Sequence, residues 1–157
     1  HILPLETDII LEPGRFLMAD GGILVSRATY VKRESKKDYV ILDAGMNDLM
    51  RPSLYDAYHP LWPVEKRKDA KESVFDIVGP VCETGDTFHE NLKLQDVEQG
   101  DYLAFLKAGA YCAVMGSFYN ARSLPAEVLV EGNEYEKIRD PITLQDIMEK
   151  ETIPDWI

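Results

Sequence analysis

Short strands separated by turns are the feature that most constrains the fold of this chain. Runs of β-branched and aromatic residues, bounded by glycine, proline or charged turns, favour β-strands. These runs are residues 23–32, 39–43, 74–78, 101–107, 126–131 and 136–142. Residues 59–64 carry two prolines, so any strand there is an edge strand or an interrupted one. About seven or eight short strands with little helix predict a mostly β domain, a β-sandwich or barrel with short helices.

Few segments favour helix. Residues 15–22 are expected to form a short helix or coil. Ser53 is expected to cap a short helix that ends at Tyr58, and Thr143 to cap a final helix over residues 144–150.

An apolar run near the start of the chain fits the strand pattern poorly. Residues 8–11 favour a strand, which Pro13 and Gly14 end with a turn. We therefore predict that residues 1–22 are the end of a preceding domain, whose sheet includes this first strand. Residues 23–157 are predicted to form the mostly β domain.

The charge balance bears on partners. The chain carries 28 acidic and 17 basic residues, a net charge of −11. Because phosphate groups attract basic surfaces, this charge argues against nucleic acid and anionic membranes as partners. No apolar run approaches the roughly 20 residues that cross a bilayer. Since the sequence shows no signal peptide, we expect a cytoplasmic protein.

Cysteine and histidine do not indicate a metal site. Cys82 and Cys112 lack a second cysteine or a histidine at ligand spacing, and His59 and His89 lack nearby ligand partners. Cys112 lies in a run of small apolar residues and is expected to be buried. We predict no bound metal.

The turn Glu12-Pro13-Gly14-Arg15 places a carboxylate and a guanidinium at the end of an apolar strand. Active sites of α/β barrels are built at the carboxyl ends of strands, and such a turn can offer backbone N–H groups to a phosphate. Arg15 can bind a carboxylate or phosphate through two hydrogen bonds. The alternative is an ordinary surface turn, which composition alone favours.

A second motif pairs Cys82 with Glu83 in a loop bracketed by glycines. Free thiols have a pKa of about 8.5, so a thiol on an exposed loop can donate a proton to a carbanion near neutral pH. A free cysteine is more often a small buried apolar side chain. The residues alone leave both interpretations open.

Arg51 and Tyr55 lie four positions apart, so they share one face if this segment is helical. A guanidinium and a phenol suit a carboxylate ligand, although an arginine packed over a surface aromatic ring is commoner. A second polar and aromatic cluster, for which loop packing is the alternative, contains Tyr111, Tyr119, Asn120 and Arg122.

In order and spacing, these motifs resemble those of diaminopimelate decarboxylases, pyridoxal-phosphate enzymes of lysine biosynthesis. The matching segments are 12–15, 43–48, 51–58, 78–86, 109–111, 119–122 and 125–128. They cover nearly the whole chain. Single segments also occur in related amino-acid decarboxylases of the same fold, but the set is specific.

The resemblance implies a two-domain lyase with pyridoxal 5′-phosphate as its cofactor. An N-terminal α/β barrel would carry the lysine that bonds the cofactor, and this chain would be the last barrel strand plus the C-terminal β domain. The enzyme would convert meso-2,6-diaminopimelate to L-lysine and CO₂, in a site shared between the subunits of a homodimer. The chain alone lacks such a lysine and is expected to be inactive.

The resemblance also implies cofactor contacts. Glu12 would pair with the ring nitrogen of the cofactor, and Pro13, Gly14 and Arg15 would lie against it. Tyr119 would touch both the cofactor phosphate and the substrate.

Substrate contacts are implied in the same way. Arg15, Arg51 and Tyr55 would hold a substrate carboxylate, and Glu83 would bind a substrate ammonium. Cys82, delivered from the partner subunit, would protonate the carbanion.

Two other interpretations stay open. The chain could belong to a related decarboxylase of ornithine, arginine or a polyamine precursor, although the Arg51 and Tyr55 pair favours a substrate with a distal carboxylate. It could also be a stand-alone β domain with a binding role, which the missing lysine favours.

Overall fold

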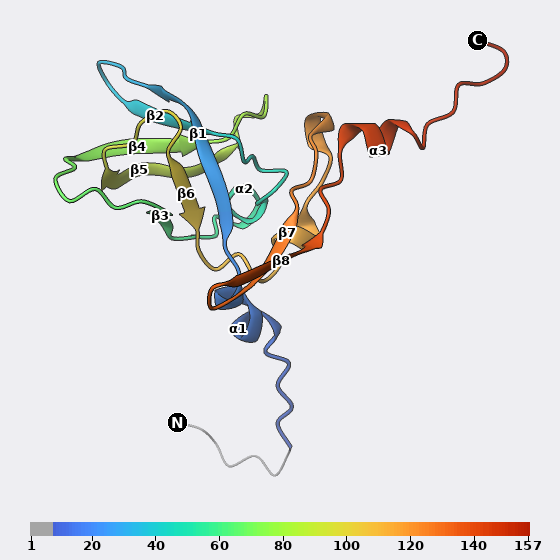
Figure 1. Cartoon of the computed structure of the whole chain (residues 1–157), viewed down its shortest axis with the longest axis horizontal. Helices are drawn as coiled ribbons and strands as arrows, with labels where there is room; N and C mark the ends of the chain where they lie inside the picture. Colours follow the sequence, from blue (N-terminus) through green and yellow to red (C-terminus); the bar gives the residue numbers. More distant parts are fainter. Residues whose placement is uncertain (1–7) are drawn as a thin grey trace.

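The computed structural model describes residues 8–157, which form mostly short strands (Figure 1). Six strands form one sheet in the order β3-β6-β1-β2-β4-β5, and β7 and β8 form a separate hairpin. The strands are β1 (Leu24–Lys32), β2 (Asp38–Leu42), β3 (Leu61–Pro63), β4 (Glu72–Val78), β5 (Thr87–Gln95), β6 (Tyr102–Phe105), β7 (Glu127–Glu131) and β8 (Glu134–Arg139). The helices are α1 (Gly14–Met18), α2 (Arg51–Tyr55) and α3 (Leu144–Met148), with 3₁₀ turns η1 (Ala19–Gly21), η2 (Ala113–Met115) and η3 (Tyr119–Ala121).

The six-stranded sheet curls until it nearly closes, because its two edge strands, β3 and β5, also contact each other. Neighbouring strands pair antiparallel except β2 and β4, which are parallel. Pro63 lies in the edge strand β3 and Pro60 directly precedes it, so the prolines are at a sheet edge, as the sequence predicts. The predicted fold class, a mostly β barrel-like domain with short helices, is confirmed.

Strand direction decides where the connecting loops meet. β2 and β4 run in the same direction, and β6 runs with them because β2 and β6 are both antiparallel to β1. The loops that follow these three strands therefore leave from one end of the sheet. α1 and η1 lead into β1 at that same end, because β1 runs the opposite way. The topology thus gathers α1 and the segments 43–50, 79–86 and 106–111.

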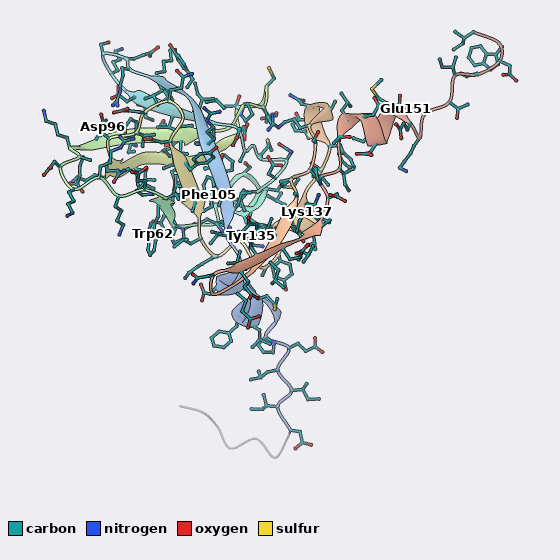
Figure 2. The ribbon with its side chains drawn as sticks, viewed as in Figure 1. Trp62, Asp96, Phe105, Tyr135, Lys137 and Glu151 are labelled. Atoms are coloured by element: carbon teal, nitrogen blue, oxygen red, sulfur yellow. The ribbon has the colours of Figure 1, made fainter. Side chains whose placement is uncertain are left out.

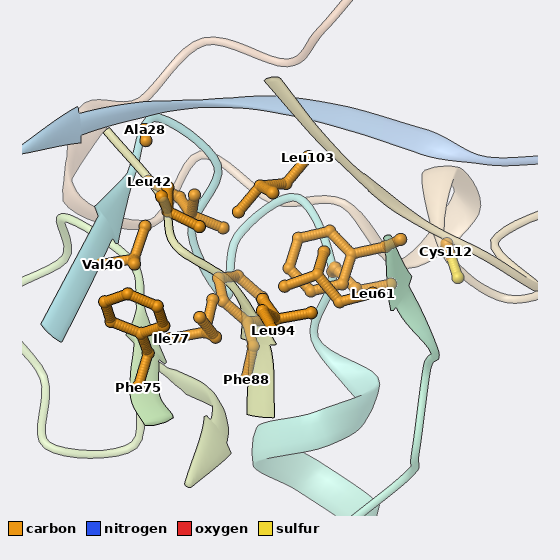
Figure 3. Packing of buried hydrophobic residues seen from close by; sticks show 13 residues of the cluster. Ala28, Val40, Leu42, Leu61, Phe75, Ile77, Phe88, Leu94, Leu103 and Cys112 are labelled. Carbon is orange, nitrogen blue, oxygen red and sulfur yellow. The ribbon is translucent and has the colours of Figure 1, made fainter. Parts of the chain in front are cut away.

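The interior of the curled sheet is apolar. Phe75, Phe105, Leu42 and Leu103 have no accessible surface and pack together with the other buried aliphatic side chains (Figure 3). Cys112 lies at one end of this cluster and is buried, as the sequence predicts.

The sequence pattern did not predict β5. Asn91, in the middle of this strand, has a φ of 52°, which is left-handed, and its N–H donates to the Asp76 carboxylate at 2.8 Å. The register between β4 and β5 shifts at this bulge, and Glu90 and Asn91 are both exposed. Two successive exposed residues break the alternation by which a strand is recognised in sequence.

Residues 8–13 have no regular secondary structure, so the strand expected over residues 8–11 is not formed in this chain. Ile9 and Ile10 are exposed, and no strand among the described residues lies beside them to complete a ladder. The first seven residues of the predicted barrel segment 1–22 lie outside the described residues.

Helix α2 differs from its prediction. It begins at Arg51, so Ser53 lies inside the helix and does not cap it. Pro52 occupies the first turn, where its fixed φ favours the helix and its missing N–H costs nothing. The helix ends before Asp56, whose left-handed φ of 52° stops it short of Tyr58.

The C-terminal part extends away from the six-stranded sheet (Figure 1). Thr143 caps α3 through a reciprocal capping box with Asp146, as predicted. The β7–β8 hairpin carries exposed apolar side chains, which are Val128, Leu129, Val130, Tyr135 and Ile138. Figure 2 shows Tyr135 on this hairpin. Because an isolated hairpin is at best marginally stable in water, this surface suits contact with another polypeptide.

Removal of one core aromatic ring tests this description of the interior. Phe75→Ala should lower the free energy of unfolding of this chain by about 3–5 kcal/mol, because it leaves a cavity where no solvent reaches. Phe16→Ala is the matched control, since Phe16 is 85% exposed, and should change it by less than about 0.5 kcal/mol. Urea unfolding of the three proteins measures both values, and equal losses would contradict the assigned core.

Candidate functional site

Helix α2 and two loops bring part of the predicted site together. The Arg51 guanidinium lies 5.3 Å from the centre of the Tyr55 ring and 5.7 Å from that of Tyr111. A Cβ placed on Gly14 would lie 3.2 Å from the Tyr111 hydroxyl oxygen. The amino end of α1, one face of α2 and the Tyr111 loop therefore meet at this point.

The pair of Arg51 and Tyr55 confirms the predicted sharing of one helix face. Arg51 is half-buried, whereas Tyr55 is 59% exposed and Tyr111 is 46% exposed. A guanidinium between two aromatic rings is held by cation–π attraction while its N–H groups stay free to bind an anion.

The sequence predicts no role for Tyr111 beyond membership of a polar and aromatic cluster. The structure places it at this site. Its φ of 59° turns the backbone sharply. The loop before it is fixed to the turn after α1, because Gly109 N–H donates to Ala19 at 3.0 Å and Ala108 N–H donates to Gly22 at 2.8 Å. The signal that could have singled it out is its place in the Gly109-Ala-Tyr111 segment, one of the matching motifs.

Tyr119 occupies a different position. With Met46, Asn47, Met50 and Ser117 it lines a cavity of about 430 Å³. Among the described residues, no hydrogen bond or cation–π contact joins Tyr119 to Tyr111, Gly14 or Arg51. Its implied role at the cofactor stays a prediction.

Glu12, Pro13 and Arg15 lie at the amino end of α1 and are exposed. Arg15 is close enough to act on His59, which is 5% exposed. Burial lowers the pKa of His59 from its ordinary value of 6.5, and the positive charges of Arg51 and Arg15 lower it further. The hydrogen bond between the ring and the Leu106 carbonyl acts in the opposite direction and raises this pKa. Both arginines therefore lie near His59.

Cys82 and Glu83 are exposed at the tip of the loop 79–86. Backbone hydrogen bonds inside the loop fold it tightly. The Gly79 N–H donates to the Asp86 backbone carbonyl at 2.9 Å, and the Asp86 N–H donates to the Glu83 backbone carbonyl at 3.1 Å. Burial raises the pKa of the Asp86 carboxyl group, although backbone N–H groups that bond it act in the opposite direction. The exposed thiol favours the interpretation of Cys82 as a reactive group over that of a buried apolar side chain.

Residues 8–157 contain neither a metal-binding cluster nor a membrane-spanning helix. No group of three or more histidine, cysteine, aspartate or glutamate side chains is arranged to hold a metal ion. No helix in the same part of the chain has the length and apolar character to cross a membrane.

Comparison with known families matches residues 16–109 to the C-terminal sheet domain of pyridoxal-dependent decarboxylases. Diaminopimelate decarboxylase of Aquifex aeolicus is 50% identical over 135 residues, which cover 86% of this chain and 32% of that protein. The corresponding protein of Archaeoglobus fulgidus is 40% identical over 155 residues, which cover 99% of this chain and 37% of that protein. The chain thus spans about a third of the length of the curated relatives it matches.

Solved structures agree. A crystal structure from Aquifex aeolicus has a TM-score of 0.86 and 47% identity, and the match covers 92% of this chain and 36% of that one. Diaminopimelate decarboxylase from Helicobacter pylori complexed with L-lysine has a TM-score of 0.82 and 40% identity, with coverage of 93% and 36%. A lysine/ornithine decarboxylase from Vibrio vulnificus, at 22% identity and a TM-score of 0.61, shares the fold.

Two neighbouring buried histidines, His59 and His89, make the stability of the chain depend on pH. His89 donates from Nε2 to the His59 carbonyl at 2.8 Å, and burial lowers the pKa values of both rings from 6.5. The unfolded chain therefore takes up protons that the folded chain does not, and stability falls as pH drops below about 6.5. His89→Gln keeps an N–H donor and should reduce this slope by up to about 1.4 kcal/mol per pH unit.

Urea unfolding at pH 7.5, 6.5 and 5.5 measures the slope. Glu90→Gln is the control, because Glu90 is exposed, adjoins His89 in the sequence and leaves both buried rings in place. An unchanged slope in His89→Gln would contradict the assignment of His89 as a buried neutral ring.

Proposed function

The chain belongs to the pyridoxal-dependent decarboxylases, and we propose that it is the C-terminal part of a diaminopimelate decarboxylase. The whole enzyme would convert meso-diaminopimelate to L-lysine and CO₂ in the cytoplasm. The observation that carries this proposal is the cluster of Arg51, Tyr55 and Tyr111 against the amino end of α1. It joins motifs that lie far apart in the sequence, as a shared site requires.

The residues at α1 fit pyridoxal 5′-phosphate. Bound at this site, the cofactor would supply an electron sink for the loss of CO₂. Glu12 would hold a proton at the ring nitrogen, and Pro13, Gly14 and Arg15 would lie against the ring. The close approach of the Tyr111 hydroxyl to Gly14 supports Tyr111 as a second tyrosine at the cofactor, in addition to Tyr119.

Substrate recognition follows from charge. Diaminopimelate carries an ammonium and a carboxylate at each end, so one end must be recognised while the other reacts. Arg15 and Arg51, with the Tyr55 hydroxyl, would bind carboxylate, and Glu83 would bind the distal ammonium. A site with such polar groups discriminates strongly against ligands that leave them unpaired.

Cys82 would donate the proton that replaces CO₂. Its exposure at the tip of a tightly bonded loop supports a role outside its own domain, and we propose that it reaches the site of the partner subunit in a homodimer. The two halves of each site would then come from different chains.

A preceding α/β barrel would complete the enzyme. The chain spans 32% of the first relative, and exposed apolar residues on α1, Phe16, Leu17 and Met18, offer a surface for such a domain. The barrel would supply the lysine that bonds the cofactor, and residues 8–11 would pair as a strand within it.

The other interpretations have weaker support. Relatives at 40–50% identity are diaminopimelate decarboxylases, whereas the lysine/ornithine enzyme shares 22%. A stand-alone binding domain would leave the exposed apolar surfaces of α1 and the β7–β8 hairpin uncovered.

Substrate preference of the full-length protein tests the proposal. With added pyridoxal phosphate it should release CO₂ and L-lysine from meso-diaminopimelate, with kcat/KM at least roughly 1,000-fold higher than for L-ornithine, because ornithine leaves the carboxylate-binding arginine unpaired. The 157-residue chain alone should release none. Equal activity on ornithine would favour the related decarboxylases. Activity of the 157-residue chain alone would contradict the proposal that a preceding barrel supplies the lysine that bonds the cofactor.

Removal of the thiol tests the proton donor. In the full-length enzyme, Cys82→Ala should lower kcat roughly 100-fold or more, a loss typical of a missing general acid, with little change in KM. Thr84→Ala is the control, because Thr84 is exposed in the same loop and has no assigned role. A raised KM with unchanged kcat in Cys82→Ala would mean that the thiol only binds substrate.

A further inference from the structure

The Asp86 carboxylate joins the loop 79–86 to a second loop. Asp86 is 3% exposed, and its two oxygens accept hydrogen bonds from different segments. One oxygen accepts from the Val81 N–H at 2.7 Å, inside its own loop, and the other accepts from the Met46 N–H at 2.6 Å. Gly79 makes room for this arrangement, because a Cβ there would overlap the carboxylate. The loop that presents Cys82 is thereby bonded to the segment that leads into α2.

A second bond joins the same loop to α2 itself. The Ser53 hydroxyl donates to the Gly85 carbonyl at 2.5 Å. Ser53 lies in the helix between Arg51 and Tyr55. Its side chain therefore does not cap the helix but binds the loop 79–86. The loop is therefore held at Gly85 and Asp86, two consecutive residues directly before β5.

The segment that leads into α2 is itself fixed from the opposite side. Asn47 is fully buried, its side-chain oxygen accepts from Arg122 Nε at 2.9 Å, and its carbonyl accepts from the Ser117 N–H at 2.9 Å. Arg122 and Ser117 therefore hold this segment without any contribution from the Cys82 loop. The hydrogen bonds of Asp86 and Ser53 then fix the Cys82 loop relative to this segment and to α2.

We propose that Asp86 and Ser53 are positioning residues, which set the place of Cys82 and Glu83 by bonding their loop to the segment that carries Arg51. This inference rests on the proposed function, in which Cys82 moves a proton. Neither Asp86 nor Ser53 is assigned a contact with the substrate. In the proposed dimer, Cys82 serves the partner's site and Arg51 its own, so these bonds also make one rigid unit of two half-sites.

Variants of the full-length protein test the inference. Ser53→Ala should lower kcat roughly fivefold, the effect of one lost neutral hydrogen bond on the placement of the proton donor, while KM for meso-diaminopimelate stays within about twofold. Ser53→Thr keeps the hydroxyl and should restore kcat to within about twofold of wild type. Asp86→Asn loses one acceptor oxygen and should lower kcat roughly tenfold or more. Ser35→Ala, in the exposed turn between β1 and β2, is the control and should change nothing.

A chemical readout separates this inference from the proposed function. The rate at which iodoacetamide alkylates Cys82, followed by mass spectrometry of its peptide, should rise at least roughly twofold in Ser53→Ala and Asp86→Asn, because a loosened loop exposes the thiol more often. It should be unchanged in Ser53→Thr and Ser35→Ala. If the wild type releases no CO₂ but the alkylation rates follow this order, the proposed function fails and the positioning stands. If Ser53→Ala has the same alkylation rate and the same kcat as the wild type, the proposed positioning role is overturned. This outcome holds whether or not Asp86→Asn folds.

Discussion

The parallel pairing of β2 with β4 is the constraint on which the site depends. If these strands were antiparallel, the loops after them would leave from opposite ends of the sheet, and α2 could not meet the loop 79–86. Parallel neighbours also need a long crossover connection, which here is the segment 43–71. That connection contains α2, so the topology that closes the sheet also delivers Arg51 and Tyr55 to the end where the other loops emerge.

The loops at this end hold their shape through buried polar groups, in contrast to the apolar interior of the sheet. Asn47 and Asp86 are buried, and both have hydrogen-bond partners that balance the cost of removing them from water. A network of this kind fixes positions more tightly than apolar contacts do, because hydrogen bonds constrain both distance and angle. Exposed groups such as Cys82 can therefore keep a defined place without being packed themselves.

The sequence predicted those parts of the fold that local patterns determine. Strands with clear alternation, the cap at Thr143 and the shared face of Arg51 and Tyr55 were all recognisable from residues a few positions apart. β5 was not, because the bulge at Asn91 depends on a bond to Asp76 in the neighbouring strand. The strand predicted at residues 8–11 needs a neighbouring strand that the described residues do not supply. Tyr111 was missed as a site residue for a similar reason, since its place follows from tertiary bonds between its loop and the turn after α1.

Under the proposed function, solvent decides how much these charges can do. Glu12 and Arg15 are exposed in this chain, and two unit charges 4 Å apart attract by only about 1 kcal/mol in water but by about 4 kcal/mol at the effective dielectric of a protein surface. Recognition of a doubly zwitterionic substrate therefore requires walls that exclude water. The exposed apolar side chains of α1 lie directly beside these charges, so a domain that covers Phe16 and Leu17 would also remove water from Arg15. Burial of apolar surface and strengthening of the charged contacts would then be two effects of a single domain contact.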